Sequence, residues 1–180
     1  MSEKKNGLSV AKKTLQVVHY MRRQPPNIFS VERLHDDIRA NLYDTISVDV
    51  RKNKNFSKGI FKRLADAVSA IRFQADINHV TGDTHYLTFF LKRKITILTI
   101  LDCIALERSR GIKFWMLWLF WYWLPEKCCS QIVVISEATK KQVIRHLNCD
   151  PEKIRVIYCN VSDAFKAQTK CFNDQAPRIL

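Results

Sequence analysis

Short apolar runs rich in β-branched residues alternate with stretches of helical periodicity along almost the whole of this 180-residue chain. The runs lie at 15–20, 45–50, 75–80, 94–101, 131–136 and 153–158. Because strands and helices have different side-chain periods, each run with the stretch after it predicts one β/α unit. A series of such units favours a parallel sheet with right-handed crossovers. The predicted fold class is therefore α/β, a Rossmann-like, mainly parallel sheet with helices on both faces.

The segments between these runs carry signals for the beginnings of helices. Ser30 and Ser136 are suited to cap helices, and Asp150 followed by Pro151 predicts a single helical turn. The apolar residues of 60–71 recur three and four positions apart, which predicts an amphipathic helix. The runs 94–101 and 131–136 predict strands buried on both faces. Helices are predicted at 30–42, 60–71, 111–124 and 137–147, with a short helix ending at 90 and a turn at 150–152.

Length and charge limit the classes of function. With 180 residues and a hydrophobic fraction of 47%, the chain can bury the core of one domain. Its 30 Lys and Arg against 17 Asp and Glu give a net charge of +13, which favours anionic partners. A solvated basic face is the alternative. Nucleic acid is disfavoured as a partner, because no motif of a nucleic-acid-binding module is present. The polar, basic residues 1–13 are predicted to be disordered.

The six cysteines form neither a CxxC pair nor a Cys/His set at zinc-ligand spacing. The N-terminal segment "MSEKKNGLSV" lacks the apolar region of a secretory signal. These features predict a reduced, cytoplasmic protein without a metal site. The chain has only four glycines, and neither a GxGxxG motif nor a phosphate-binding loop, so no dinucleotide cofactor is expected.

All four tryptophans fall in the stretch "GIKFWMLWLFWYWLPEKCC" at 111–129. Its uninterrupted apolar part is 114–124, whereas a membrane span needs about 20 residues. The stretch is instead predicted to be a crossover helix between the fourth and fifth strands. Its outer face is more apolar than a solvated helix requires. Because Arg108, Arg110 and Lys113 precede it, this face is expected to contact an anionic membrane interface or, equally, another protein surface.

Polar residues that follow the predicted strands are the site candidates, because parallel α/β sheets bind ligands beyond the carboxyl ends of their strands. The stretch "NHVTGDTH" places His79, Asp83 and His85 around a glycine turn, where they would converge on a polar ligand. A plain strand-end loop, with Asp83 capping the next helix, explains the same residues.

Two further strand ends carry candidate residues. Asp102 follows the strand 94–101, where it is suited to accept from a sugar hydroxyl or to take part in proton transfer. A helix cap or a partner for an arginine is the alternative. Ser136 and Glu137 lie at a strand-to-helix junction, where free N–H groups favour an anion or a hydroxyl. An ordinary helix cap explains Ser136 as well.

Several stretches, taken in order, resemble the N-terminal domain of family 4 glycosyltransferases. They are "FSVERL" (29–34), "HVTGDTHYL" (79–87), "ITILTILD" (95–102), "RGIKFWMLWLFWYWLPEKCCSQIVVISEATKKQVIRHL" (110–147) and "DPEKIRVIY" (150–158), so that the resemblance covers about residues 15–180. It implies one half of a GT-B enzyme, in which two Rossmann-like domains face each other across a cleft. The N-terminal half would bind the acceptor and the C-terminal half the nucleotide-sugar donor, without a tightly bound metal.

The resemblance also implies roles for the candidate residues. The candidate catalytic residue is Asp102, and the candidate acceptor-binding residues are His79, Asp83, His85, Ser136, Glu137 and Asn160. The chain departs from the family pattern where Leu101, rather than the usual His, precedes Asp102. It departs again where Cys159 precedes Asn160, since Asn first is usual.

Residues 14–176 are thus expected to form the acceptor-side domain, and "PRIL" at 177–180 to begin a donor domain that is missing. Because sugar transfer needs donor and acceptor in one closed cleft, this hexosyltransferase is expected to be truncated and inactive by itself. It would take a nucleotide-sugar only with a C-terminal domain, and its acceptor would be a carbohydrate or a lipid-linked molecule. The alternatives are a non-enzymatic basic module that binds anionic lipid or nucleic acid, and a stand-alone flavodoxin-like binding domain.

Overall fold

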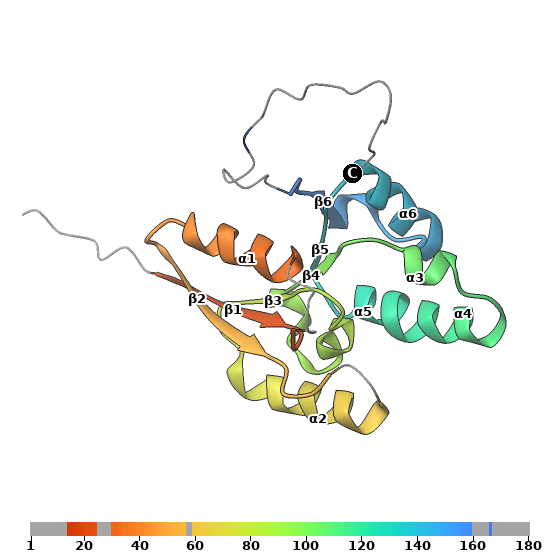
Figure 1. Cartoon of the computed structure of the whole chain (residues 1–180), viewed down its shortest axis with the longest axis horizontal. Helices are drawn as coiled ribbons and strands as arrows, with labels where there is room; N and C mark the ends of the chain where they lie inside the picture. Colours follow the sequence, from red (N-terminus) through yellow and green to blue (C-terminus); the bar gives the residue numbers. More distant parts are fainter. Residues whose placement is uncertain (1–13, 25–29, 57–58, 160–165, 167–180) are drawn as a thin grey trace, which may run out of the picture.

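A computed structural model of the chain shows a six-stranded sheet in the order β2-β1-β3-β4-β5-β6 (Figure 1). The structure describes residues 14–24, 30–56, 59–159 and 166. Every neighbouring pair of strands is parallel, so all the carboxyl ends lie at one edge of the sheet. The strands are β1 (Leu15–Met21), β2 (Ile46–Lys52), β3 (Ile77–Val80), β4 (Thr96–Ile100), β5 (Gln131–Val134) and β6 (Ile154–Val156).

Helices connect successive strands and lie on both faces of the sheet, which confirms the predicted fold class. The α-helices are α1 (Ser30–Ala40), α2 (Ile60–Ala70), α3 (Ile104–Glu107), α4 (Gly111–Leu117), α5 (Leu124–Lys127) and α6 (Glu137–Leu147). The short 3₁₀ helices are η1 (Ile71–Phe73), η2 (His85–Phe90), η3 (Arg93–Ile95) and η5 (Pro151–Lys153), while η4 (Trp118–Trp123) is a π-helix. The predicted disordered N-terminus and the 177–180 segment lie outside the described residues.

The core lies on the face of the sheet that α2, η2, η4 and α6 cover. The strand register places Val80, Leu98, Ile132 and Ile154 side by side, and all four are buried. Tyr122 of η4 belongs to the same apolar cluster, together with Val143 and Leu147 of α6. Each such side chain contributes roughly 1.5–3 kcal/mol by leaving water, so this layer holds the domain together.

The opposite face is covered by α1, whose His35 packs on His19 of β1 and His79 of β3. Away from α1 this face is more open: Val133 of β5 is only half-buried and Arg155 of β6 is exposed. The prediction that 131–136 forms a strand buried on both faces is therefore wrong for one face of β5. Among the described residues, the tertiary structure places no helix over this part of the sheet.

Helix α2 forms as predicted, but most of its apolar side chains point away from the core. Its buried residues are Asp66, Ala67 and Ala70. The small residues of α2 face the core, where the hydroxyl of Tyr20 of β1 donates to the Ala70 carbonyl oxygen at 2.9 Å. The apolar positions left exposed are Ile60 (75%), Phe61 (86%), Leu64 (48%) and Val68 (47%).

The tryptophan-rich stretch is one helical segment that runs from α4 through η4 into α5. It is attached to α6 by a hydrogen bond of 2.8 Å from Trp118 Nε1 to the His146 carbonyl oxygen. Partly buried residues of its inner side pack on the core, whereas Ile112, Trp115, Met116 and Phe120 are exposed on its outer side. Among the described residues, this helix and the others are too short or too polar to cross a membrane.

Candidate functional site

The carboxyl ends of β3, β4 and β5 bring four of the predicted site residues to one edge of the sheet. Asp83 follows β3, Asp102 follows β4, and Ser136 and Glu137 follow β5. These strands are direct neighbours in the parallel sheet, so the three loops lie next to one another. Asp83, Asp102 and Glu137 are exposed. The edge therefore presents three carboxylates to whatever binds beyond the strands.

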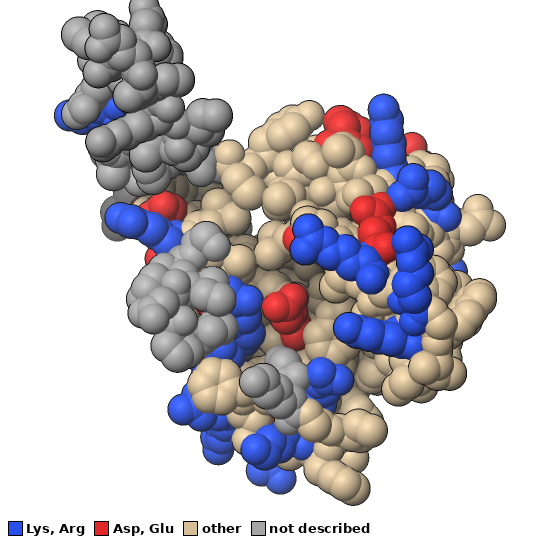
Figure 2. Space-filling model, turned by 45° about the vertical axis from the view of Figure 1, so that its right-hand side comes forward, with Lys and Arg blue, Asp and Glu red and all other residues tan. Residues whose placement is uncertain are grey.

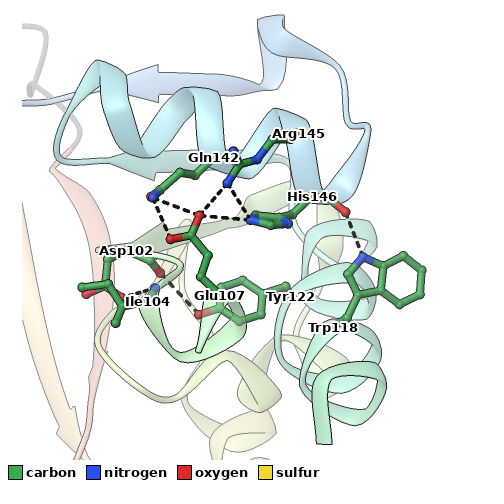
Figure 3. Close-up of polar contacts among 8 residues, drawn as sticks. All are labelled: Asp102, Ile104, Glu107, Trp118, Tyr122, Gln142, Arg145 and His146. Carbon is green, nitrogen blue, oxygen red and sulfur yellow. Dashed lines mark hydrogen bonds and ion pairs between the residues drawn. The ribbon is translucent and has the colours of Figure 1, made fainter. Parts of the chain in front are cut away.

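Asp102 lies between β4 and α3, with its carboxylate partly used in local structure. Its Oδ1 accepts a hydrogen bond of 2.9 Å from the Ile104 amide, and its carbonyl oxygen accepts one of 3.3 Å from the Tyr122 hydroxyl (Figure 3). The backbone of the residue is thus fixed from two sides. Because the side chain is exposed and a carboxylate accepts several hydrogen bonds, it retains capacity for a ligand hydroxyl.

Ser136 caps α6, as its sequence position predicts. Its Oγ accepts from the Thr139 amide at 3.1 Å, and the Thr139 hydroxyl donates to the Leu101 carbonyl oxygen at 3.3 Å. The second bond joins the β5–α6 junction to the residue just before Asp102. Glu137 is the first residue of α6 and is exposed, so the helix N-terminus and its carboxylate face the same edge.

Asp83 belongs to an ion-pair chain that the sequence did not predict. Arg22, just after β1, pairs with Asp83 at 3.3 Å and with the buried Glu32 of α1 at 2.9 Å. Both partners raise the pKa of Arg22. Gly82 has a φ of 65°, which turns the chain so that Asp83 reaches Arg22. These ion pairs join the loop after β1 to the loop after β3. The strand order of the sheet changes direction between β1 and β3.

His79 lies inside β3 rather than in the loop, and it is part of a histidine cluster. Its ring stacks on that of His19 at 4.7 Å, and the His35 ring lies edge-on to His19 at 4.6 Å. His79 Nε2 is 2.7 Å from the Thr99 hydroxyl, and Arg39 lies 3.0 Å from His19 Nδ1. We call His19, His35 and His79 the histidine cluster.

Burial keeps the histidine cluster neutral. It lowers the pKa of His19 to about 2 and the pKa values of His35 and His79 to about 4, and the neighbouring imidazoles add to the effect for His19 and His79. Both ring nitrogens of His35 and Nε2 of His19 are buried without a hydrogen-bond partner. Burial of this kind disfavours the charged form of the imidazole. Among the described residues, no set of His, Cys, Asp and Glu is arranged to hold a metal ion.

His85 points into the protein and holds the tryptophan-rich segment. Its Nδ1 is 2.6 Å from the Trp121 carbonyl oxygen, and its ring packs against Trp121 and Tyr122. Burial lowers the pKa of His85, while the charges of Asp83 and Asp102 oppose that shift. Both aspartates are therefore near enough to act on one buried imidazole. His79, Asp83 and His85 otherwise have different hydrogen-bond partners, so the convergence expected from their spacing is not seen in these contacts.

A second polar cluster joins α3 to α6 beside Asp102 (Figure 3). Glu107 accepts from Gln142 Nε2 at 3.2 Å and from Arg145 at 2.6 Å, and it lies 3.3 Å from His146 Nε2. These residues were not predicted, because the sequence separates Glu107 from α6 by the whole tryptophan-rich stretch. Asn160, the remaining predicted site residue, lies outside the described residues.

Lys and Arg outnumber Asp and Glu on one face of the protein, where basic side chains surround a hollow that has an acidic side chain at its centre (Figure 2). This arrangement agrees with the net charge of +13. It favours the approach of an anionic molecule, because a concave basic surface concentrates the electrostatic field.

Comparison with known proteins supports a family assignment. The model of Glycosyltransferase Family 4 matches residues 11–165, which is most of the chain. No curated protein matches the sequence significantly. The fold is similar to the crystal structure of Anabaena Alr3699/HepE in complex with UDP and glucose, with a TM-score of 0.55 and 13% identity. The match covers 82% of this chain and 45% of that one, so this chain spans less than half of that protein's length.

Proposed function

Because the chain belongs to glycosyltransferase family 4, we propose that residues 14–176 form the acceptor-binding half of a hexosyltransferase. The observation that supports this most is the row of exposed carboxylates at the carboxyl edge of β3 and β4, where α/β sheets bind ligands. Carboxylates accept hydrogen bonds from sugar hydroxyls. A nucleotide-sugar is the proposed donor, since the solved protein of the same fold holds UDP and glucose.

We propose that Asp102 is the catalytic residue. It accepts the proton of the acceptor hydroxyl as the acceptor oxygen bonds to the anomeric carbon of the sugar, while the bond from that carbon to the phosphate oxygen breaks and the nucleotide leaves. Its exposed carboxylate at a fixed backbone position suits that role. Asp83, Ser136, Glu137 and Asn160 are the proposed acceptor contacts. His79 is half-buried in the histidine cluster and His85 is buried, so their proposed contribution is to position the β3 loop and the tryptophan-rich segment.

A donor-binding domain, in the same chain or in another one, completes the proposed enzyme. Donor and acceptor must meet in one closed site, and this chain covers only 45% of the solved chain that holds UDP and glucose. Residues 1–180 are therefore expected to show no turnover with a nucleotide-sugar by themselves. Turnover by the 180-residue chain would contradict this part of the proposal.

Replacing Asp102 tests the site. In the enzyme assembled with its donor-binding domain, Asp102→Asn is expected to lower kcat by about 10²–10⁴-fold, the usual contribution of a general acid or base. The matched control is Asp49→Asn, which changes an exposed aspartate on the edge strand β2 and is expected to leave kcat unchanged. An Asp102→Asn enzyme with the wild-type kcat would exclude the proposed role.

We also propose that the protein works at an anionic membrane surface from the cytoplasmic side. The supporting observation is the exposed row Ile112, Trp115, Met116 and Phe120 beside basic residues at the start of α4. Binding to anionic vesicles and to oligonucleotides, measured at increasing salt concentrations, tests both the membrane proposal and the non-enzymatic alternative. Salt-sensitive binding to vesicles and none to oligonucleotides is expected, and the reverse result would favour a nucleic-acid-binding module.

A further inference from the structure

An apolar groove of about 590 Å³ runs between α2 and the tryptophan-rich segment. Leu64 lines one wall, Met116 and Phe120 line the other, and Phe89 of η2 lies between them. Leu64, Met116 and Phe120 are each about half exposed. This volume is within the range of about 300–1,000 Å³ that is typical of small-molecule sites. We call it the apolar groove.

The apolar groove leads to the edge of the sheet that carries the candidate site. Helix α2 follows β2, whereas α3 lies between β4 and α4, and α4 begins at the outer end of the α3–α4 loop and runs back toward the sheet (Figure 1). Ile112 lines the groove at the beginning of α4, whereas Trp121 of the lining lies closer to the candidate site: it packs against His85, and the adjacent Tyr122 donates to the Asp102 carbonyl oxygen. A ligand lying along the groove would therefore come nearest to the loops that hold Asp83 and Asp102 where Tyr86 and Trp121 line it.

The walls suit a hydrocarbon chain better than a peptide. An extended peptide would bring backbone N–H and C=O groups that need partners, and burying them without partners costs several kcal/mol per group. The apolar groove supplies few hydrogen-bond partners for a peptide backbone. The hydroxyl of Tyr86, for example, already accepts a hydrogen bond of 2.8 Å from Asn53 Nδ2. A hydrocarbon chain has no such groups, so it enters without this desolvation cost.

The polar groups that the apolar groove does offer are positively charged. Arg63 lies over the Trp121 ring at 4.7 Å, and Lys113 is exposed on the opposite wall. The described lining residues include no aspartate or glutamate. An anionic head group at the end of an apolar chain matches this distribution of charge.

We propose that the apolar groove binds the hydrocarbon chain of an anionic lipid, with its head group near Lys113 and Arg63. Resting on the proposed function, we further assign this lipid as the acceptor class: the chain lies in the groove while the head-group end reaches Asp83 and Asp102. The exposed Trp115 and Phe120 place the mouth of the groove at the membrane surface from which such a lipid comes.

Binding of alkyl phosphates tests the groove without any donor or transfer reaction. Octyl, decyl and dodecyl phosphate are titrated below their critical micelle concentrations, with tryptophan fluorescence and calorimetry as readouts. Affinity is expected to rise by about fourfold for each added methylene until the groove is full. Inorganic phosphate is expected not to bind. Affinity that does not change with chain length would overturn the proposal, because it would indicate a phosphate site alone.

Filling the apolar groove distinguishes it from the membrane-facing surface. Leu64→Trp is expected to weaken dodecyl phosphate binding by tenfold or more while binding to phosphatidylglycerol vesicles is retained. The matched control is Val68→Trp, an equally exposed position of α2 outside the lining, which is expected to leave both unchanged. Lys113→Gln is expected to weaken dodecyl phosphate by up to about fivefold and not to affect the neutral dodecyl maltoside.

The outcomes separate this inference from the proposed function. Dodecyl phosphate binding that Leu64→Trp leaves intact would place the lipid elsewhere. A concentration-dependent dimer that Leu64→Trp dissociates, together with absent lipid binding, would assign the groove to a second copy of the chain and overturn the proposal. If lipid binds in the groove but the assembled enzyme transfers sugar only to soluble acceptors, the groove stands and its assignment to the acceptor is wrong.

Discussion

Acidification is expected to destabilise this protein through the histidine cluster well before its carboxylates titrate. His19, His35 and His79 are neutral in the folded protein because burial lowers their pKa values to about 2, 4 and 4. In the unfolded chain they titrate near pH 6.5. Below that pH the unfolded state binds more protons, so the free energy of unfolding falls as pH falls. This stability is complete above about pH 6.5 and is lost progressively down to the folded pKa values.

The size of the effect follows from the linkage of protonation to folding. Between pH 7.0 and 5.5, one histidine that titrates only in the unfolded state removes roughly 1 kcal/mol, and three remove between about 3 and 4 kcal/mol. The buried His85, whose pKa is also lowered, adds to the loss. Glu32 and Glu126 have lowered pKa values, so the stability they contribute is lost only below about pH 4.5. The loss of the free energy of unfolding between pH 7.0 and 5.5 is therefore due to histidines.

The groups facing the cluster do not change this sign. Arg39 approaches His19 and also pairs with Asp36, and its charge lowers the pKa values of His19 and His35. Glu32 and Asp36 act in the opposite direction on His35, but burial is the largest cause and outweighs them. The Thr99 hydroxyl beside His79 does not titrate in this range.

Urea unfolding at pH 7.0 and 5.5 measures the loss, and His35→Leu isolates one histidine. This variant is expected to lose roughly 1 kcal/mol less than the wild type over the interval, because it removes one proton-binding site of the unfolded chain. Arg33→Gln, on the exposed side of the same helix, is expected to lose as much as the wild type. Equal losses for His35→Leu and the wild type would show that His35 is charged in the folded protein and would refute this reasoning.

Three further substitutions test other contacts. Arg22→Met leaves Glu32 buried without its partner and is expected to lower the free energy of unfolding by about 3–5 kcal/mol. The control Arg51→Met breaks an exposed pair with Asp49 and is expected to lower it by less than about 1 kcal/mol. Equal losses for the two variants would contradict the importance assigned to burial. Gly82→Ala forces a φ of 65° on a residue with a Cβ and is expected to lower the free energy of unfolding by about 1–2 kcal/mol, and Gly82→Asn to lower it less. Thermal unfolding measures both variants, and an unchanged Tm would argue against that backbone conformation. Trp118→Phe removes the hydrogen bond to His146 and should cost about 1 kcal/mol by urea unfolding, and a neutral result would mean that the bond adds nothing.

The positions of the strands and most helices could be predicted because their signals are local. Ser136 caps α6 through the Thr139 amide, and Asp150 caps the turn at Pro151, as the short sequence motifs indicate. The helical period of 60–71 likewise predicted α2. It did not predict which side of α2 is buried, because the packing of α2 on the rest of the domain buries Ala67 and Ala70 rather than the larger apolar residues.

The candidate site was predicted in part. Asp83, Asp102, Ser136 and Glu137 follow strand ends, and the parallel sheet places those ends together. The spacing of His79 and His85 suggested the same location, but strand alternation turns His79 toward α1, and the 3₁₀ turn buries His85 beneath Trp121. Arg22 and Glu32 come from other elements, so their ion-pair chain with Asp83 had no signal in the sequence.

The sequence by itself determined the α/β class and the length limit on a membrane span, since both depend on the periodicity and extent of apolar residues. Its ordered set of motifs also indicated the glycosyltransferase family, which the family match confirms. Only the tertiary structure decided which apolar residues stay outside the core. The apolar groove and the histidine cluster each join elements far apart in the chain, and burial in such assemblies depends on how helices pack on the sheet rather than on the residues next to them in sequence.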